Sequence, residues 1–214
     1  MNGRYTPADV YWFPGIAGDG KGLAFGARRT LLPVDPGTKY SMATTNAADL
    51  DGDGDFDLVI GDTSGAVLVA KNQGSRTEPK FVTREPLRVG DQPMKVSHKS
   101  DPLPVDWDGD GVLDILVGDE GGDVSFFAGR KDGTYSAGVS LFSGLPVDPR
   151  DNYTKAKAKL DPHRVIPGFR LRLATADWND DGKLDLLIGN CETTPAAGGK
   201  GGKTVGHVYV LLRQ

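Results

Sequence analysis

The sequence has few of the residues that carry disulfide bonds, acid–base catalysis or membrane insertion. It contains one cysteine, Cys191, and three histidines among 214 residues, and only 8% of its residues are aromatic. A single cysteine excludes a disulfide within the chain and leaves the redox compartment undetermined. The longest apolar stretches, such as residues 113–117 and 184–188, are far shorter than the roughly 20 residues of a membrane-spanning helix. We therefore expect no insertion into a membrane.

The chain also has little net charge. The formal net charge is −4 at pH 7, and much of the acidity lies in three short loops, where bound divalent cations would offset it. No basic stripe is present, so nucleic acid is not an expected partner. Residues 1–10 lack the basic and apolar regions of a signal peptide, which taken alone indicates a cytoplasmic protein.

Glycine and proline, in contrast, are plentiful. The chain has 30 glycines and 14 prolines, a composition typical of many short strands joined by tight turns. Its length and its hydrophobic content of 38% allow one sizeable core. The composition predicts an all-β protein.

One pattern occurs three times and organises the chain. The copies are ADLDGDGDFDLVIGD at residues 48–62, VDWDGDGVLDILVGD at 105–119 and ADWNDDGKLDLLIGN at 176–190. Their first aspartates, Asp49, Asp106 and Asp177, lie 57 and then 71 residues apart. This period is typical of the four-stranded blades of a β-propeller.

Each loop is expected to join the first two strands of a blade. The first strands are predicted at residues 41–47, 103–105 and 171–176, and the second strands at 57–60, 114–117 and 185–188. Third strands are predicted at 66–70, 123–128 and 207–210, and fourth strands at 80–86 and 139–142. Residues 10–15 and 24–33, joined by a turn at 17–21, fit the last two strands of a further blade.

The repeat count predicts an incomplete ring. We expect one partial β-propeller domain over residues 1–214, with a half blade at about 1–33 and repeats at about 34–90, 91–146 and 147–214. Propellers have roughly four to eight blades, so about three and a half require either a missing remainder of the chain or self-association with a second copy. Insertions at residues 143–168 and 192–206 are expected to form loops on one rim, the second of them flexible.

The three loops are predicted calcium sites. Carboxylates at positions 1, 3 and 5 of a tightly curled loop converge, a glycine at position 6 permits the turn, and the carbonyl at position 7 and the aspartate at position 9 complete the set. Oxygen ligands favour Ca²⁺ over zinc or copper. The predicted ligands of the three Ca²⁺ ions are Asp49, Asp51, Asp53, Asp55 and Asp57; Asp106, Asp108, Asp110, Val112 and Asp114; and Asp177, Asn179, Asp181, Lys183 and Asp185.

Two other interpretations of the loops were weighed. An EF-hand needs a glutamate at position 12 and flanking helices, but position 12 is Ile60, Val117 or Ile188 within a predicted strand. Simple turns also favour aspartate and glycine. Three copies in register, each with an aspartate at position 9, favour metal sites over turns. An affinity of about 10⁻⁴ to 10⁻³ M, as in extracellular modules, is expected.

The loop and the strand after it resemble the FG-GAP or VCBS-type repeats of the integrin alpha-subunit propeller and of bacterial surface and secreted proteins. The resemblance covers nearly the whole chain and implies a calcium-binding propeller outside the cell or at its surface. Animal integrins have Gly-Ala-Pro after this strand, where this chain has Gly-Asp or Gly-Asn. It therefore resembles the bacterial type more closely. Trp107 and Trp178, at position 2, are expected to pack between blades.

Two functions follow from the resemblance. The first is a calcium-stabilised module for adhesion, scaffolding or the binding of a protein or carbohydrate ligand. The alternative is the propeller part of a polysaccharide lyase or another carbohydrate-active enzyme. His98, His163, Arg170 and Arg172 lie on or beside predicted first strands, and their convergence in one cleft would favour the enzyme. Cys191 is not expected to be a nucleophile, and the sequence has no standard hydrolase or phosphate-binding motif.

Overall fold

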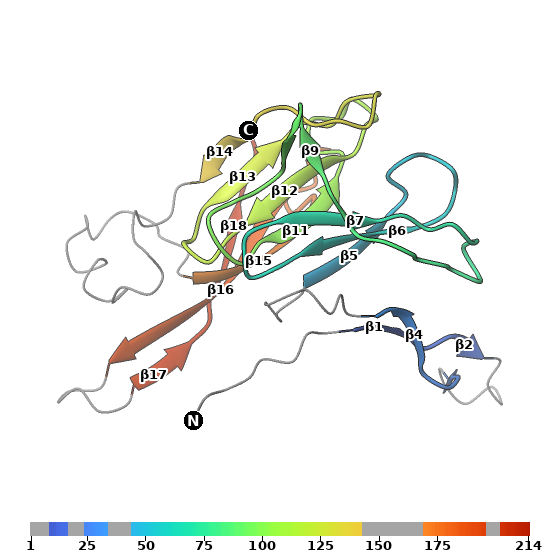
Figure 1. Ribbon diagram of the computed structural model, residues 1–214. Helices are drawn as coiled ribbons and strands as arrows, with labels where there is room; N and C mark the ends of the chain where they lie inside the picture. The colour runs from blue at the N-terminus through green and yellow to red at the C-terminus, as the bar shows by residue number, and fades with distance from the viewer. Residues whose placement is uncertain (1–8, 17–23, 34–43, 143–168, 196–201) are drawn as a thin grey trace.

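The computed structural model describes residues 9–16, 24–33, 44–142, 169–195 and 202–214, in which all regular elements are β-strands (Figure 1). They form small antiparallel sheets, which confirms the all-β class. No helix in these ranges is long and apolar enough to span a membrane. The strands are β1 (Val10–Trp12), β2 (Gly15–Ile16), β3 (Ala24–Phe25), β4 (Arg29–Leu32), β5 (Thr44–Ala48), β6 (Asp57–Gly61), β7 (Val67–Ala70), β8 (Glu85–Pro86), β9 (Arg88–Val89), β10 (Gln92–Pro93), β11 (Asp101–Val105), β12 (Asp114–Gly118), β13 (Val124–Phe127), β14 (Val139–Phe142), β15 (Phe169–Ala176), β16 (Asp185–Pro195), β17 (Gly202–Val205) and β18 (Val208–Leu211).

Three sheets carry the three repeats. We call β5–β6–β7–β8 the first sheet, β11–β12–β13–β14 the second sheet, and β15–β16–β17 with β18 beside β16 the third sheet. In each sheet the aspartate-rich loop joins the first two strands, and in the first sheet Ala48 and Asp57 face each other where the loop closes. The other two loops close in the same register. Within the described residues, the predicted positions of the first three strands of each repeat are confirmed. Residues 41–43 of the first predicted strand lie outside the described residues.

The fourth strand of the first sheet is shorter than predicted. Only β8 pairs with β7, whereas the prediction covered residues 80–86. The amide side chain of Asn72 explains the difference, because its oxygen accepts the N–H groups of Gly74 (3.0 Å) and Lys80 (2.9 Å). These bonds hold the segment before β8 as a loop. In the second sheet, β14 coincides with the predicted strand.

The hydrophobic cores lie between neighbouring sheets. Alternate residues of a strand point to opposite faces, so each buried strand serves two cores. The core between the first and second sheets contains Val59, Val67, Val69, Ile115, Val117 and Phe127. The core between the second and third sheets contains Leu116, Val124, Leu171, Leu186 and Ile188, with Trp107 packed against it. The expectation that Trp107 packs between two sheets is confirmed.

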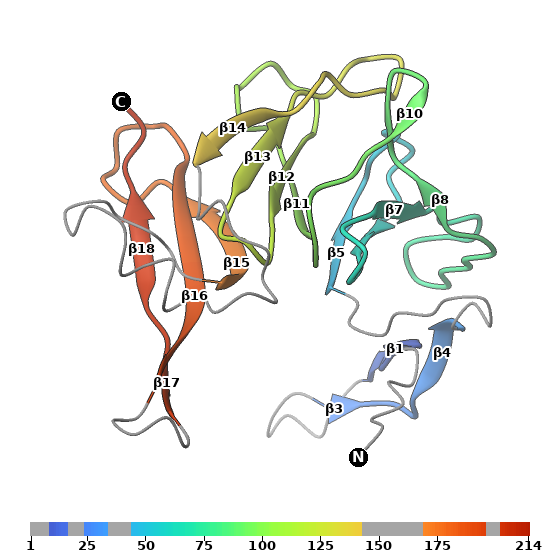
Figure 2. The same cartoon turned by 60° about the vertical axis from the view of Figure 1, so that its left-hand side comes forward.

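The first strands of the three sheets lie next to one another. β11 contacts both β5 and β15, and Figure 2 shows the three sheets following one another side by side. The side chain of Asn46 on β5 donates a hydrogen bond to the carbonyl of Pro102 on β11 (2.7 Å). The backbone N–H of Leu173 on β15 donates to the carboxylate of Asp101 on β11 (3.2 Å).

An N-terminal hairpin precedes the first sheet. β1 pairs with β4, and β2 pairs with β3. Leu32 on β4 is 2% exposed and packs with Leu58 and Ile60 of the first sheet. Each of the two predicted strands, residues 10–15 and 24–33, is therefore present as a pair of shorter strands, and the predicted turn at residues 17–21 lies outside the described residues.

The described part of the second predicted insertion, residues 192–195 and 202–206, includes the two arms of a hairpin, and residues 196–201 of the run predicted to be flexible lie outside the described residues. β16 continues to Pro195 and pairs with β17, so that Glu192 faces Val205. The β-branched residues Thr193, Thr194 and Thr204 favour this extended pairing. The first insertion, residues 143–168, lies outside the described residues.

Candidate metal centres

Positive φ angles shape all three loops. Gly54, Gly111 and Gly182 at position 6 have φ of 91°, 85° and 83°, a left-handed conformation that side chains disfavour. Position 4 is also left-handed, with glycine in the first two loops and Asp180, at a φ of 60°, in the third. The sharp turn predicted at position 6 is confirmed, and it points the side chains of neighbouring positions towards one centre.

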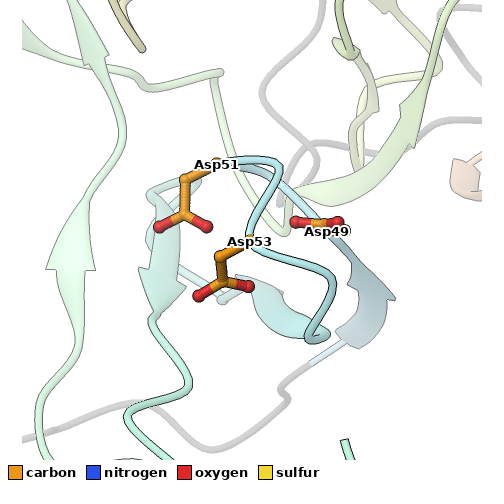
Figure 3. Close-up of side chains that lie close together, drawn as sticks. All are labelled: Asp49, Asp51 and Asp53. Atoms are coloured by element: carbon orange, nitrogen blue, oxygen red, sulfur yellow. The ribbon is translucent and has the colours of Figure 1, made fainter. Parts of the chain in front are cut away.

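The first loop, residues 49–57 between β5 and β6, gathers three carboxylates. Asp49 accepts the backbone N–H groups of Gly52 (2.8 Å) and Gly54 (2.9 Å), which fixes its orientation. One oxygen from each of Asp49, Asp51 and Asp53 lies within 4.8 Å of the others (Figure 3). Like charges at such distances repel one another unless a cation lies between them. This triad could hold a metal ion such as Ca²⁺.

The second loop, residues 106–114 between β11 and β12, forms a similar group. Asp106 accepts the N–H groups of Gly109 (2.9 Å) and Gly111 (3.0 Å). Carboxylate oxygens of Asp106, Asp108 and Asp114 lie within 4.8 Å of one another. This second triad could also hold a metal ion, and it includes the position 9 aspartate.

The third loop, residues 177–185, keeps the turn but has one carboxylate fewer at positions 1, 3, 5 and 9. Asp177 accepts the N–H groups of Gly182 (2.8 Å) and Asp181 (3.0 Å). At position 3, the Asn179 amide donates a hydrogen bond to Asp181 (3.0 Å). Within this fully described loop no three carboxylates come together as they do in the other two. Its calcium site stays a prediction.

The position 9 aspartates have a structural role that the sequence did not reveal. Asp57, Asp114 and Asp185 are 3%, 1% and 0% exposed. Each accepts a backbone hydrogen bond from just beyond the third strand of its sheet: Asp57 from Asn72 (2.8 Å), Asp114 from Gly129 (2.7 Å) and Asp185 from Arg213 (2.7 Å). The only sign of this role in the sequence is the place of each aspartate at the start of a buried strand, where a carboxylate needs polar partners. These bonds tie each loop to the third strand.

One oxygen of Asp57 has no hydrogen-bond partner although it is buried. In the other two loops the corresponding oxygen accepts an N–H, from Trp107 to Asp114 (2.8 Å) and from Trp178 to Asp185 (2.9 Å). Burial raises the pKa of Asp57, although the hydrogen bond from the N–H of Asn72 acts in the opposite direction. A divalent cation would give the lone oxygen a positive partner. The residues of the first loop therefore fit a hard cation such as Ca²⁺.

No family model matches the chain. Comparisons with curated proteins and with solved structures also found no similar protein. The resemblance to FG-GAP and VCBS repeats thus depends on the loop residues quoted above. The metal-binding role depends on the geometry of the loops.

An ammonium group from outside the first loop lies beside its carboxylates. Lys71 Nζ lies 3.0 Å from Asp51 Oδ2, and this hydrogen bond raises the pKa of Lys71. Lys71 directly precedes Asn72, whose N–H binds Asp57. In the second sheet the equivalent donor to Asp114 is Gly129, and the residue directly before it is Ala128. A cation in the first loop therefore has to compete with an ammonium group that the second loop lacks.

Replacing Lys71 should strengthen calcium binding in the first loop. The exposed Lys71–Asp51 pair has a net worth of up to about 1 kcal/mol, so Lys71→Met should lower the dissociation constant about two- to five-fold. The reciprocal variant, Ala128→Lys, should weaken the second site by a similar factor. Calcium titration calorimetry of both variants tests this, and unchanged affinity in both would contradict competition by the ammonium group.

Stability without calcium should depend on the ionisation of Asp114. Burial raises the pKa of this carboxyl, although the N–H groups of Gly129, Trp107 and Asp108 lower it. A carboxyl with a raised pKa in the folded state stabilises the fold below its unfolded pKa of about 3.9. That stabilisation is lost as pH rises through the folded value. In a chelator, the stability of Asp114→Asn relative to the wild type should therefore rise as the pH rises above about 4, as measured by urea unfolding. A difference independent of pH would contradict it.

The residues considered for catalysis do not form one described site. Arg172 pairs with Asp101 at 3.3 Å, and His98 uses its carbonyl to accept the N–H of Glu120. His163 and the side chain of Arg170 lie outside the described residues. Instead, Arg172 lines a shallow hollow of about 420 Å³ with Cys191 and His207, a juxtaposition that the sequence did not indicate. No hydrogen bond between the thiol and the imidazole occurs in the described part of the chain.

A larger hollow of about 480 Å³ lies between the first two loops. Asp49 and Asp51 form one wall, and Arg130, Lys131 and Tyr135 form part of the other. Burial, followed by the charge of Asp114, raises the pKa of Tyr135 to about 12, so its hydroxyl stays protonated at neutral pH. The volume is within the range of small-ligand sites. This hollow combines charged side chains of both signs with a neutral hydroxyl donor.

Proposed function

We propose that this chain is a calcium-stabilised repeat module that binds a protein or carbohydrate ligand, or acts as a scaffold, outside the cell. The observation that carries the proposal is the carboxylate triad of the first loop with the lone buried oxygen of Asp57 beside it. The ions have a structural role in this proposal, because each loop joins two strands and is tied to the third. The resemblance to FG-GAP and VCBS repeats supports the same role.

The arrangement of the sheets supports a propeller. In the first two sheets the strands follow one another in sequence order, and in the third sheet β18 pairs with β16. The first sheet packs against the second and the second against the third, and the first strands of the three sheets lie next to one another. These are the features of consecutive blades. In this proposal the three sheets are blades and the N-terminal hairpin is the outer half of a fourth.

Calcium titration calorimetry tests the proposal. We expect three ions per chain, two in the triads of the first and second loops and one in the third loop. Asp53→Ala, Asp110→Ala and Asp181→Ala should each remove one ion. Asp91→Ala is the matched control, because Asp91 is an exposed aspartate outside the loops. Full stoichiometry in all three loop variants would contradict the metal assignment.

The affinity bears on the location. Dissociation constants of about 10⁻⁴ to 10⁻³ M would suit the millimolar calcium found outside cells. Values below about 10⁻⁶ M are those of intracellular sensors and buffers, and they would contradict an extracellular role while leaving the metal sites intact.

A further inference from the structure

The third sheet presents a surface that is buried in the other two sheets. We define the forward face of a sheet as the side that packs against the following sheet. The pairing registers place the same positions on this face in all three sheets. Its residues are Val59, Val67 and Val69 in the first sheet, Leu116, Val124 and Phe126 in the second, and Leu187, Val208 and Val210 in the third.

Exposure distinguishes the third forward face from the other two. Val67 and Val124 are 0% exposed, whereas Val208, in the same register, is 70% exposed. Trp178 is 62% exposed, although Trp107 at the same loop position packs against the core between the second and third sheets. The expectation that Trp178 packs between two sheets is therefore wrong. The third forward face is an apolar surface without the cover that its counterparts have.

The complementary side, which packs against a preceding sheet, is exposed on the N-terminal hairpin at the other end of the row of sheets. Residues 10–15, VYWFPG, align with residues 124–129, VSFFAG, so Phe13 corresponds to Phe127. Phe127 is 6% exposed and belongs to the same core as Val67 and Val69. Phe13 is 51% exposed, and Tyr11 on the same hairpin is 42% exposed. Figure 2 shows the hairpin and the third sheet at opposite ends of the row.

We infer that the forward face of the third sheet docks the N-terminal hairpin of a second copy of this chain. Phe13 of the second copy would cover Val208 and Val210 as Phe127 covers Val67 and Val69 within one copy. The two uncovered surfaces are complementary in kind, because each is one half of the interface that the chain already makes between its sheets. The hairpin of the same copy lies at the far end of the row, with two sheets between. The contact joins two different surfaces, head to tail.

The mass of the purified chain in solution tests this inference. In millimolar calcium, light scattering should give at least twice the 22.7 kDa of one chain. Val208→Lys and Phe13→Lys should each reduce the mass to that of one chain at the same concentration. Both residues are exposed within a single copy, so neither change disturbs a core. Val82→Lys is the matched control, since Val82 is 55% exposed and belongs to neither surface. It should keep the wild-type mass.

Mixing the two variants identifies the surfaces. The Phe13→Lys chain retains a normal forward face, and the Val208→Lys chain retains a normal hairpin. An equimolar mixture should therefore form a complex of two chains although each variant alone is a monomer. Pairing of two third sheets with each other would leave Phe13→Lys associated by itself, and that result would overturn the inference.

Two further outcomes would also overturn it. One is a wild-type chain that stays monomeric up to high micromolar concentration. The other is an assembly whose mass neither lysine variant changes. Calcium titration of the same samples keeps this inference separate from the proposed function, because a monomer that binds its ions would reject the docking and leave the metal sites standing. Loss of calcium binding in a chain that still associates would reject the metal sites and leave the docking standing.

Discussion

Chelation of calcium should lower the melting temperature of the protein by about 10 to 20 °C. A ligand at about one hundred times its dissociation constant stabilises the folded state by about 2.7 kcal/mol per site. The two carboxylate triads together would then contribute about 5 kcal/mol. In a domain of this size, each kcal/mol corresponds to about 2–4 °C. Differential scanning calorimetry measures the shift between a chelator and calcium at about one hundred times the dissociation constant, which is about 10 mM for a site of about 10⁻⁴ M.

The control for this experiment is the cation itself. Magnesium requires a smaller, nearly octahedral site and gives up its water reluctantly, so it should restore little of the lost stability. Asp53→Ala and Asp110→Ala should each reduce the calcium-dependent shift by about half, because each removes a carboxylate from one loop. An unchanged melting temperature on chelation, with both variants silent, would reject calcium as a structural ion.

Alanine at one repeat position should destabilise the three sheets to very different extents. The position is the glycine that ends the second strand: Gly61, Gly118 and Gly189. A methyl group at Gly61 would lie 2.1 Å from the carbonyl oxygen of Ser100, just before the first strand of the second sheet, so Gly61→Ala should cost about 2–3 kcal/mol. At Gly118 the nearest atom is Leu171 Cβ, at 3.0 Å, and we expect about 1 kcal/mol.

Gly189→Ala is the matched control in this series. The nearest atom to its added methyl group is 3.7 Å away, and replacing a glycine without strain restricts the unfolded chain. We expect no loss, or a gain of up to about 1 kcal/mol. Urea unfolding in calcium gives these values, and a Val208→Lys background removes any second copy from the comparison. Equal effects at all three positions would mean that the glycine serves its own strand and not the approach of the next sheet.

The local structure of the repeats could be predicted from the sequence because its signals are local. The glycine at position 6 predicts a left-handed turn, and the apolar residues of runs such as 57–60 are enough to predict buried strands. The convergence of Asp49, Asp51 and Asp53 follows from the same spacing. All of these features depend on residues within one loop and the strand that follows it.

Long-range partners could not be predicted in this way. The hydrogen bond from Asn72 to Asp57 joins β6 to a residue just beyond the end of β7, and the salt bridge of Lys71 with Asp51 depends on where β7 ends. The pairing of β16 with β17 was not predicted, because the glycines and lysines of residues 194–203 favoured a flexible loop over the extended pairing of the neighbouring threonines. Trp178 was expected to be covered like Trp107 because both occupy position 2 of the same loop pattern, and the pattern of one loop does not show which surfaces pack against its side chains.

The approach of neighbouring sheets at Gly61 and Gly118 has an evolutionary consequence. Each sheet carries both halves of the contact, a glycine-bearing side for its successor and an apolar side for its predecessor, so a duplicated repeat would arrive with its interfaces already made. Such a chain can gain or lose a repeat by gene duplication or deletion without inventing a new surface. The number of sheets is then set by copy number in the gene, while the geometry of each junction stays the same.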